Sequence, residues 1–210
     1  MGGLRRLARR LVGDQMGVAM IEFAYAAPVF LAAILTGLEL TNLVLAHLRV
    51  SQMAMAVADN AGRVPSGIDE VHIREVFAGA QVIGGPMDFQ QNGRIVLSSL
   101  EDNGRKNSSG GQWIRWQRCW GEGKYDPAYG RQGDGEGNAS LKKGLGSSGN
   151  RIIAASGTSV MFVEATYKYQ PLIATGFFDP PTIHYESAFN VRGRQNNAIS
   201  NTQSLPVLAC

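Results

Sequence analysis

The stretch Asp14-Gln-Met-Gly-Val-Ala-Met-Ile-Glu-Phe-Ala24 leads into a long apolar segment and places one carboxylate, that of Glu22, just inside it. Between Val18 and Leu48 the chain has no lysine or arginine, and its only other acid is Glu39. A charged side chain inside a membrane-spanning helix costs roughly 2.5 to 3.5 kcal/mol on insertion scales. A carboxylate that is retained at such a cost indicates that Glu22 has a function.

Basic residues precede the apolar segment, at Arg5, Arg6, Arg9 and Arg10. Positive residues that flank a hydrophobic segment stay on the cytoplasmic side of a membrane. We therefore expect a basic cytoplasmic leader over residues 1–17, a transmembrane and amphipathic helix over residues 18–64, and a periplasmic domain over residues 65–210. The protein would cross the inner membrane once. A cleavable secretory signal fits poorly, because the apolar segment continues well past the small-x-small site at residues 24–26.

The helix expected after residue 17 changes character along its length. From Val18 to Leu48 it spans about 46 Å, which exceeds the roughly 30 Å of a hydrocarbon core. Beyond Leu48 the apolar positions recur on one face, which predicts packing against the outer domain. These positions are Val50, Met53, Ala54, Val57, Ala61 and Val64. Gly62 or the Pro65-Ser-Gly67 cluster should end the helix.

Three further residues bear on how this helix packs. Pro28 removes one backbone hydrogen bond and should kink the helix near its start. Gly37, with several alanines, permits close approach of other helices in lipid. Glu39 lies about 25 Å along the axis from Glu22. It either reaches water at the outer boundary or takes part in helix pairing, and the sequence leaves both open.

The order of basic residues, glycine, four residues, glutamate, an aromatic residue and a long apolar helix resembles the start of type IV prepilins. The residues that carry this resemblance are Gly17-Val-Ala-Met-Ile-Glu-Phe23. Together with Pro28 and Gly37-Leu-Glu-Leu40, this segment looks like the TadE-like family, the minor pseudopilins of the Tad (Flp) pilus system. Residues 163–172 and 188–192 add a looser similarity to that family's closing strands. The middle of the chain adds none.

The resemblance implies processing and assembly. A prepilin peptidase would cut between Gly17 and Val18, so that Glu22 becomes the fifth residue of the mature chain, followed by Phe23. The Glu22 carboxylate of a neighbouring subunit would then neutralise the new α-ammonium group as helices bundle, and two charges that are costly in lipid become a pair. In the alternative, Glu22 lies in the headgroup region of an uncleaved anchor.

The resemblance also implies partners. These are the prepilin peptidase, the inner-membrane pilus assembly platform, and other pilin and pseudopilin subunits through the N-terminal helix. An outer domain of about 150 residues is a full domain in size, which favours a minor or initiating subunit over the main pilin of an adhesive pilus. The protein would then be found in the inner membrane or within an extracellular pilus.

The two cysteines, Cys119 and Cys210, would lie in an oxidising compartment if the outer domain is periplasmic. Their even count favours a disulfide over two free buried thiols. Such a bridge closes a loop of about 90 residues, worth on the order of 4 kcal/mol in the chain-entropy model.

The outer domain is predicted to be α+β, with a helix-backed antiparallel sheet, and the resemblance implies a pilin-like fold. A helix is expected over residues 69–79, capped by Ser66 or Asp69, with an apolar side made of Val71, Val76 and Phe77. Strands are expected over residues 94–100, 113–120, 160–169 and 182–191.

Alternation along the strands predicts their faces. In the second strand Ile114, Trp116 and Trp120 should lie on one side and Cys119 on the other, an aromatic pattern more typical of a core than of a ligand platform. In the last strand one face should carry Ile183, Tyr185, Phe189 and Val191.

Residues 121–149 include nine glycines in 29 positions. A loop this long should be mobile or ordered by a ligand. Gly144–Gly149 matches G-x-G-x-x-G but neither follows a strand nor opens a helix, so we interpret it as a turn. Asp134, Glu136 and Asn138 alternate as in a calcium loop, yet the sixth and twelfth positions are alanine and leucine in place of glycine and glutamate.

Little other chemistry is indicated. The histidines, His47, His72 and His184, lack zinc-ligand spacing, and no nucleophile elbow is present. We expect no metal, no cofactor, no enzymatic activity and no nucleic-acid partner. Two other functions stay open: an uncleaved single-pass anchor with a periplasmic binding domain whose ligand site is residues 121–149, and a substrate-binding subunit of a surface enzyme complex.

Overall fold

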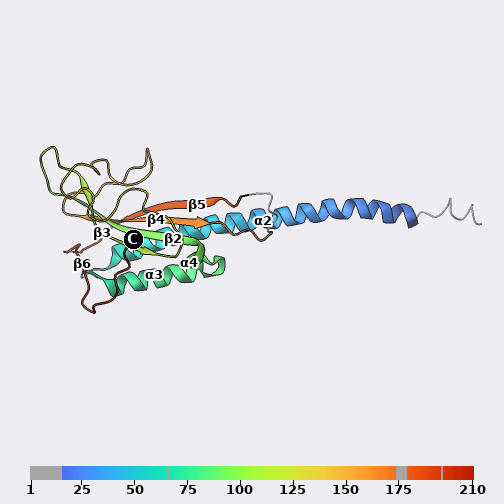
Figure 1. The fold of residues 1–210 in the computed structure, drawn as a ribbon, viewed down its shortest axis with the longest axis horizontal. Coiled ribbons are helices and arrows are strands. Elements are labelled where there is room, and N and C mark those ends of the chain that lie inside the picture. The colour runs from blue at the N-terminus through green and yellow to red at the C-terminus, as the bar shows by residue number, and fades with distance from the viewer. Residues whose placement is uncertain (1–15, 66, 174–178, 195) are drawn as a thin grey trace, which may run out of the picture. The chain divides into compact units, whose positions relative to one another are not determined.

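The computed structural model describes residues 16–65, 67–173, 179–194 and 196–210. The arginines of the expected leader and Ser66 therefore lie outside the described residues. The elements are α2 (Met16–Arg63), β1 (Ile68–Asp69), α3 (Glu70–Gly84), the 3-10 helix η1 (Gly85–Met87), α4 (Phe89–Asn92), β2 (Gly93–Asp102), β3 (Gln112–Trp120), β4 (Ser159–Lys168), β5 (Thr182–Asn190) and β6 (Ile199–Ser200) (Figure 1).

Two compact units divide the chain. One consists of residues 1–43 and 171–175, and the other of residues 44–170 and 176–210. The second unit contains an antiparallel sheet of four strands in the order β3-β2-β4-β5, and β1 and β6 form a short parallel pair. A long apolar N-terminal helix followed by a four-stranded antiparallel sheet, with α and β elements mixed, confirms the predicted class at this level.

The last part of α2 belongs to the second unit and buries one face. Its buried side chains are Ala46, Val50, Met53, Ala54, Val57, Ala58 and Ala61. The predicted face is thereby confirmed up to Ala61, whereas Val64 lies just beyond the helix and is half-buried. The helix ends at Arg63, two residues before Pro65, because the residue preceding a proline is disfavoured in helical conformation.

The carboxyl end of α2 is capped by the segment that follows β5. The guanidinium group of Arg194 donates to the carbonyl oxygens of Ala61 at 2.6 Å and Val64 at 3.0 Å, and the backbone nitrogen of Arg192 donates to Gly62 at 3.1 Å. The last carbonyls of a helix have no partner within the helix itself. Arg194 is buried, and this desolvation lowers the pKa of its guanidinium group.

Helix α3 begins at a capping box. The side chain of Asp69 accepts from the backbone of Val71, and the ring of His72 accepts from the backbone nitrogen of Asp69. Asp69 is therefore the predicted cap. The predicted apolar side needs one correction, because Ile73 is buried with Val76 and Phe77 while Val71 is only half-buried.

A buried ion pair joins α3 to the sheet. Arg118 of β3 donates to the Glu70 carboxylate at 2.7 Å through Nε, and the two side chains are only 7% and 2% exposed. Removing one member of such a pair leaves an uncompensated charge in the interior.

Strand β3 carries a bulge that corrects its predicted faces. Ile114 lies opposite Leu100 and Trp116 opposite Ser99, so that Arg115 is an extra residue in the register. Ile114 consequently packs with Leu100 and Leu145, whereas Trp120 stacks on Phe77 of α3 at 6.3 Å. Ile114 and Trp120 thus lie on opposite faces of the sheet.

The two faces of the sheet have different covers. One, the helix face, contacts α2 and α3 through pairs such as Tyr185 with His47 and Trp120 with Phe77. The other, the loop face, is covered by part of the connection between β3 and β4, where Tyr129 packs edge-on against Phe162 at 5.8 Å.

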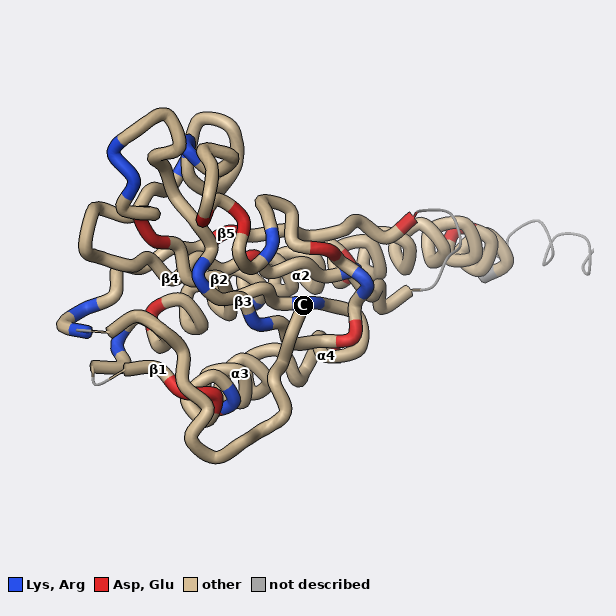
Figure 2. Tube along the Cα trace, turned by 60° about the vertical axis from the view of Figure 1, so that its left-hand side comes forward, with Lys and Arg blue, Asp and Glu red and all other residues tan. Residues whose placement is uncertain are grey.

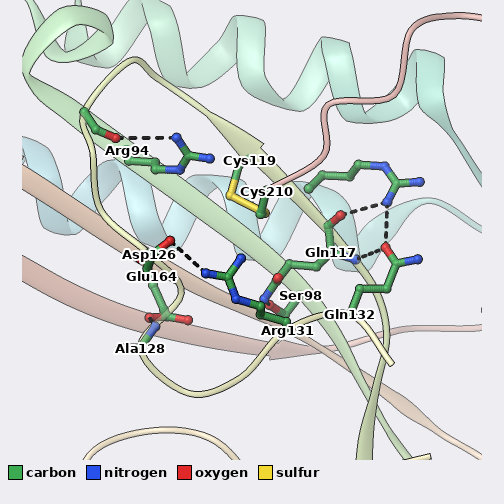
Figure 3. Close-up of a disulfide and its surroundings, with 12 residues drawn as sticks. Arg94, Ser98, Gln117, Cys119, Asp126, Ala128, Arg131, Gln132, Glu164 and Cys210 are labelled. Carbon is green, nitrogen blue, oxygen red and sulfur yellow. Dashed lines mark hydrogen bonds and ion pairs between the residues drawn. A yellow bond between two sulfur atoms is a disulfide. The ribbon is translucent and has the colours of Figure 1, made fainter. Parts of the chain in front are cut away.

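Cys119 and Cys210 form the expected disulfide, which closes a separation of 91 residues and attaches the carboxyl terminus to β3 (Figure 3). The terminal segment is held at other points as well. The backbone nitrogen of Cys119 donates to Leu208 at 2.8 Å, and Arg74 donates to Pro206 at 2.7 Å. Asp69 accepts from the backbone nitrogen of Thr202, and this hydrogen bond with that from Val71 lowers the pKa of Asp69 to about 2.

Candidate functional site

The first part of α2 is a helix with apolar side chains on every side. The most apolar window of Gly17–Arg63 is long enough to cross a membrane, and none of it is buried within the described chain. A helix that is apolar all round belongs either in a protein core or in a membrane. Because this window is not in the core, the segment is compatible with a single-pass membrane anchor.

The predicted processing residues lie at the start of this helix. Gly17, Val18, Glu22 and Phe23 are all exposed, with Phe23 at 74%. A β carbon at Gly17 would have nothing within 4 Å. Among the described residues, no cationic side chain forms an ion pair with Glu22. Within this chain, therefore, the described residues do not neutralise the Glu22 carboxylate.

The predicted packing residues Pro28 and Gly37 lie further along the same surface. Helix α2 continues through Pro28, and a β carbon at Gly37 would also have nothing within 4 Å. Among the described residues, every lysine and arginine lies in the second unit, whereas the first part of α2 carries only its two acids (Figure 2). This surface offers apolar and small side chains to lipid or to another helix.

Glu39 differs from Glu22 because the chain supplies it with partners. Its Oε2 accepts from the backbone nitrogens of Leu172 at 3.0 Å and Ile173 at 3.2 Å. All three residues belong to the first compact unit. The contact joins Glu39 to the segment that follows β4, which the sequence did not predict. Neither of the two expected roles, reaching water or pairing helices, included such a contact.

A cluster of ionisable side chains lies on the loop face of the sheet. Glu164 of β4 and Glu186 of β5 are directly opposite each other. Glu164 accepts from the backbone nitrogen of Ala128 at 2.8 Å, and Tyr129 donates to Glu186. The Nε2 of His184 lies 3.6 Å from Glu186.

The pKa values of this cluster are shifted by burial. Burial under residues of the β3–β4 connection, aided by the nearby Glu186 carboxylate, raises the pKa of Glu164 to about 7 despite the hydrogen bond from Ala128. Burial and the bond to Glu186 raise the pKa of Tyr129 to about 12. A carboxyl group with a raised pKa is suited to proton transfer. Its hydrogen bond from the backbone of Ala128 also attaches the loop to the sheet.

An open cavity of about 330 Å³ lies beside this cluster. Its lining is Ser147, Asn150, Ile152, Phe162 and residues 184–188. Glu186 and His184 therefore reach the cavity, whereas Glu164 does not line it. Such a volume could hold a small polar ligand, and it is the structural feature that the alternative function as a binding domain would require.

The glycine-rich residues 121–149 are attached to the sheet, as Figure 3 shows for Ala128 and Gln132. Gln117 donates to the carbonyl oxygen of Gly130 at 3.0 Å, and Ile114 exchanges backbone bonds with residues 133 and 134. A β carbon at Gly135 would collide with the carbonyl oxygen of Gln112. Close approach to β3 thus accounts for glycine at this position of the loop.

The other patterns in this loop are also local structure. Leu145 pairs with Ile152 as an isolated antiparallel bridge, so that the G-x-G-x-x-G match forms a turn. The Asp134 carboxylate accepts from the backbone of Arg131 at 2.7 Å, and Asn138 accepts from that of Ser140 at 2.8 Å. Both oxygens bond to neighbouring backbone, and the bond of Asn138 is an Asx turn.

No protein-family model, no curated protein and no solved structure matches the chain. The resemblance to the TadE-like family therefore remains a prediction that rests on the motif residues at the start of α2.

Sequence reasoning missed the Glu164–Glu186 cluster and the contact of Glu39. A signal for the first existed, since Glu164 interrupts an otherwise apolar strand and an acid there requires a partner. For the second the sequence gave no signal, because backbone donors 133 and 134 residues away have no side-chain signature.

Proposed function

We propose that this chain is a membrane-anchored minor pseudopilin of the Tad (Flp) pilus system, processed between Gly17 and Val18. The inner membrane would hold it as a single-pass protein, with the sheet domain in the periplasm, until it joins other pilin helices at the start or tip of a pilus. It would act in assembly and not as an enzyme.

One observation carries this proposal: an apolar helix, exposed all round, has a glycine, Gly17, in its first turn and an acid five positions later that the described residues leave without a cation. A buried or lipid-embedded carboxylate is stable only with a compensating charge. Cleavage after Gly17 would create that charge as the amino terminus of a neighbouring subunit. The segment between Val18 and Leu48 contains no lysine or arginine.

The first test is the mass and the amino-terminal sequence of the protein from membranes, with and without a co-expressed prepilin peptidase. We expect a chain that begins at Val18 only when the peptidase is present. Gly17→Val should block cleavage, whereas Gly37→Val is the matched control, because both glycines are exposed in the same helix with open space around them. A chain that keeps its original amino terminus in all cases would leave an uncleaved anchor.

The second test separates assembly from anchoring. Glu22→Gln keeps the shape of the side chain and removes its charge. It should spare membrane insertion and reduce crosslinking between two differently tagged copies and with co-expressed pilin subunits. Glu39→Gln is the control in the same helix, since the bonds of that carboxylate are to its own chain. Unchanged crosslinking and an intact pilus in the Glu22 variant would contradict the pairing role.

The alternative, an uncleaved anchor that presents a binding domain, is favoured by the cavity beside Glu186 and His184. It would predict that Glu22→Gln has no effect on function. It would also predict that Ala188→Trp, which places a large side chain on the same face as Glu186 in the cavity lining, abolishes ligand capture while leaving the disulfide-linked domain folded.

A further inference from the structure

The segment Pro171–Ile173 is fixed to the side of the apolar helix. Two successive backbone N–H groups, of Leu172 and Ile173, converge on one oxygen of Glu39 at 3.0 and 3.2 Å. Hydrogen bonds to a carboxylate are stronger than those between neutral groups. The segment is therefore held at the level of Glu39 along the helix, and both belong to one compact unit.

The level of Glu39 coincides with the far boundary of a bilayer. Glu39 is about 31 Å along the helix axis from Val18, close to the hydrocarbon thickness of about 30 Å. The neighbouring Leu38 and Leu40 are 55% and 59% exposed. At this level the helix still presents apolar side chains outward.

The attached segment adds its own apolar surface there. Leu172 is 67% exposed, so its apolar side chain is free to contact lipid. It lies next to the part of α2 whose surface is also apolar. Polar backbone groups are costly near lipid unless they are paired. The two N–H groups and the carboxylate satisfy each other, so that both become compatible with the boundary region.

We propose that the Pro171–Ile173 segment inserts into the outer interfacial region of the bilayer that α2 spans, with Leu172 as the lipid contact and Glu39 as its positioning residue. The partner is the lipid surface itself. The inference rests on the membrane anchor that the proposed function includes, but on neither cleavage after Gly17 nor pilus assembly. It gives the chain a second membrane contact and gives Glu39 a role within its own subunit.

The test uses the full-length protein in vesicles of phosphatidylethanolamine and phosphatidylglycerol. A nitroxide is attached at Leu172→Cys, and its collisions with oxygen and with a water-soluble nickel chelate are measured. The native cysteines are joined in a disulfide, so a single added cysteine is labelled selectively. Leu31→Cys on α2 gives the lipid reference, and Val82→Cys, 81% exposed on α3, gives the water reference.

We expect the label at position 172 to be shielded from the chelate and accessible to oxygen, at a depth close to the headgroups. A label that behaves like the one at Val82 overturns the inference, and so does one shielded from both reagents, which would indicate a protein partner. If the label at Leu31 is itself accessible to the chelate, the membrane anchor fails and the inference fails with it. If the label at Leu31 is in lipid and the label at position 172 is in water, the inference is overturned while the membrane anchor stands.

The role of Glu39 has its own readout. Glu39→Ala removes the acceptor for both backbone groups, and it should raise chelate collisions at position 172 toward the value at Val82 while leaving Leu31 unchanged. Glu39→Gln retains a carbonyl acceptor and should keep the label shielded. Equal shielding in the alanine variant and the parent protein would contradict the positioning role.

Discussion

The two parts of α2 are both apolar, yet their surroundings are opposite. From Gly17 to Leu43 its side chains are exposed or, at a few positions, half-buried, and they are apolar on every side. From Val50 to Arg63 the apolar side chains gather mainly on one face, and that face is buried in the second unit. The difference lies in spacing. Polar residues such as Gln52 and Asn60 occupy the outward positions of the last part, whereas the first part has almost none.

This comparison shows what each part requires. Burial of a valine, leucine or methionine side chain stabilises a protein by about 1.5 to 3 kcal/mol relative to exposure in water. The last part of α2 gains this stabilisation by packing against the sheet of its own chain. The first part gains no such burial within the chain, so its apolar side chains require lipid or other helices. The last part of α2 thus completes the core of the sheet domain, whereas the first part needs lipid or other helices to cover its apolar side chains.

The largest effect should separate the two parts directly. Met53 is fully buried, and Met53→Ala should lower the free energy of unfolding by about 2 to 5 kcal/mol because it removes packed atoms and leaves a cavity. Leu31 is 56% exposed, and Leu31→Ala should change the same quantity by less than about 0.5 kcal/mol. The measurement is denaturant unfolding in detergent, followed by the fluorescence of the three tryptophans, all in β3. Equal losses would remove the distinction between the two parts.

A second prediction sharpens how the domain holds the end of α2. Arg194→Gln removes charged donors from the carbonyls of Ala61 and Val64, and we expect a loss of about 1.5 to 3 kcal/mol of unfolding free energy. Arg192→Gln is the control, because its side chain is exposed and its cap is made by the backbone. The same unfolding experiment measures both. A similar small effect in the two variants would show that the guanidinium group does not hold the helix end.

Much of the fold was predictable from pattern. The helical spacing of Val50, Met53 and Val57 identified the buried face of α2 in advance, and Asp69 identified the start of α3. The four strands follow from β-branched and aromatic runs separated by turn residues. The disulfide followed from the number of cysteines and the expected compartment. These features depend on local sequence, in which neighbours along the chain carry the signal.

The remainder depends on contacts between distant residues. The bulge at Arg115 moved Ile114 to the loop face, and nothing in the alternation of β3 marks an extra residue. Arg194 caps the end of α2 partly through the carbonyl of Val64, 130 residues earlier in the chain. Glu39 is bound by backbone donors that any sequence would supply. In the candidate site, therefore, the motif residues were predictable, whereas the partners of Glu39 and the loop-face acids were not.

A third prediction perturbs the face of the sheet opposite α2. The folded pKa of Glu164 is raised from an ordinary 4.5 to about 7, so its protonated form is favoured by folding and the stabilisation is lost as the pH rises through about 7. Between about pH 5 and about pH 8 the unfolding free energy should fall by roughly 1 to 2 kcal/mol.

Unfolding at the two pH values, with Glu164→Gln and the exposed Glu136→Gln as a matched pair, measures this effect. The first variant should lose most of the pH dependence and the second should keep it. The difference between Met53→Ala and Leu31→Ala should persist at both pH values, because Glu164 contacts the loop and not α2. A pH dependence that is unchanged in Glu164→Gln would assign it to other groups.

The smallest predicted effect marks where the buried part of α2 begins. The hydroxyl group of Tyr185 lies 3.2 Å from Nδ1 of His47, and the two rings meet edge-on. Tyr185→Phe keeps the ring contact and removes one hydrogen bond, so the unfolding free energy should fall by about 0.5 to 1.5 kcal/mol. Tyr25→Phe removes the same hydroxyl group from the exposed part, where the side chain is 78% exposed, and should leave unfolding in detergent unchanged. If both changes are silent, the contribution of α2 to the domain begins beyond His47, at the fully buried Val50. If Tyr25→Phe is the costlier change, the exposed part has a partner within the chain, and the argument that it requires lipid or other helices is wrong.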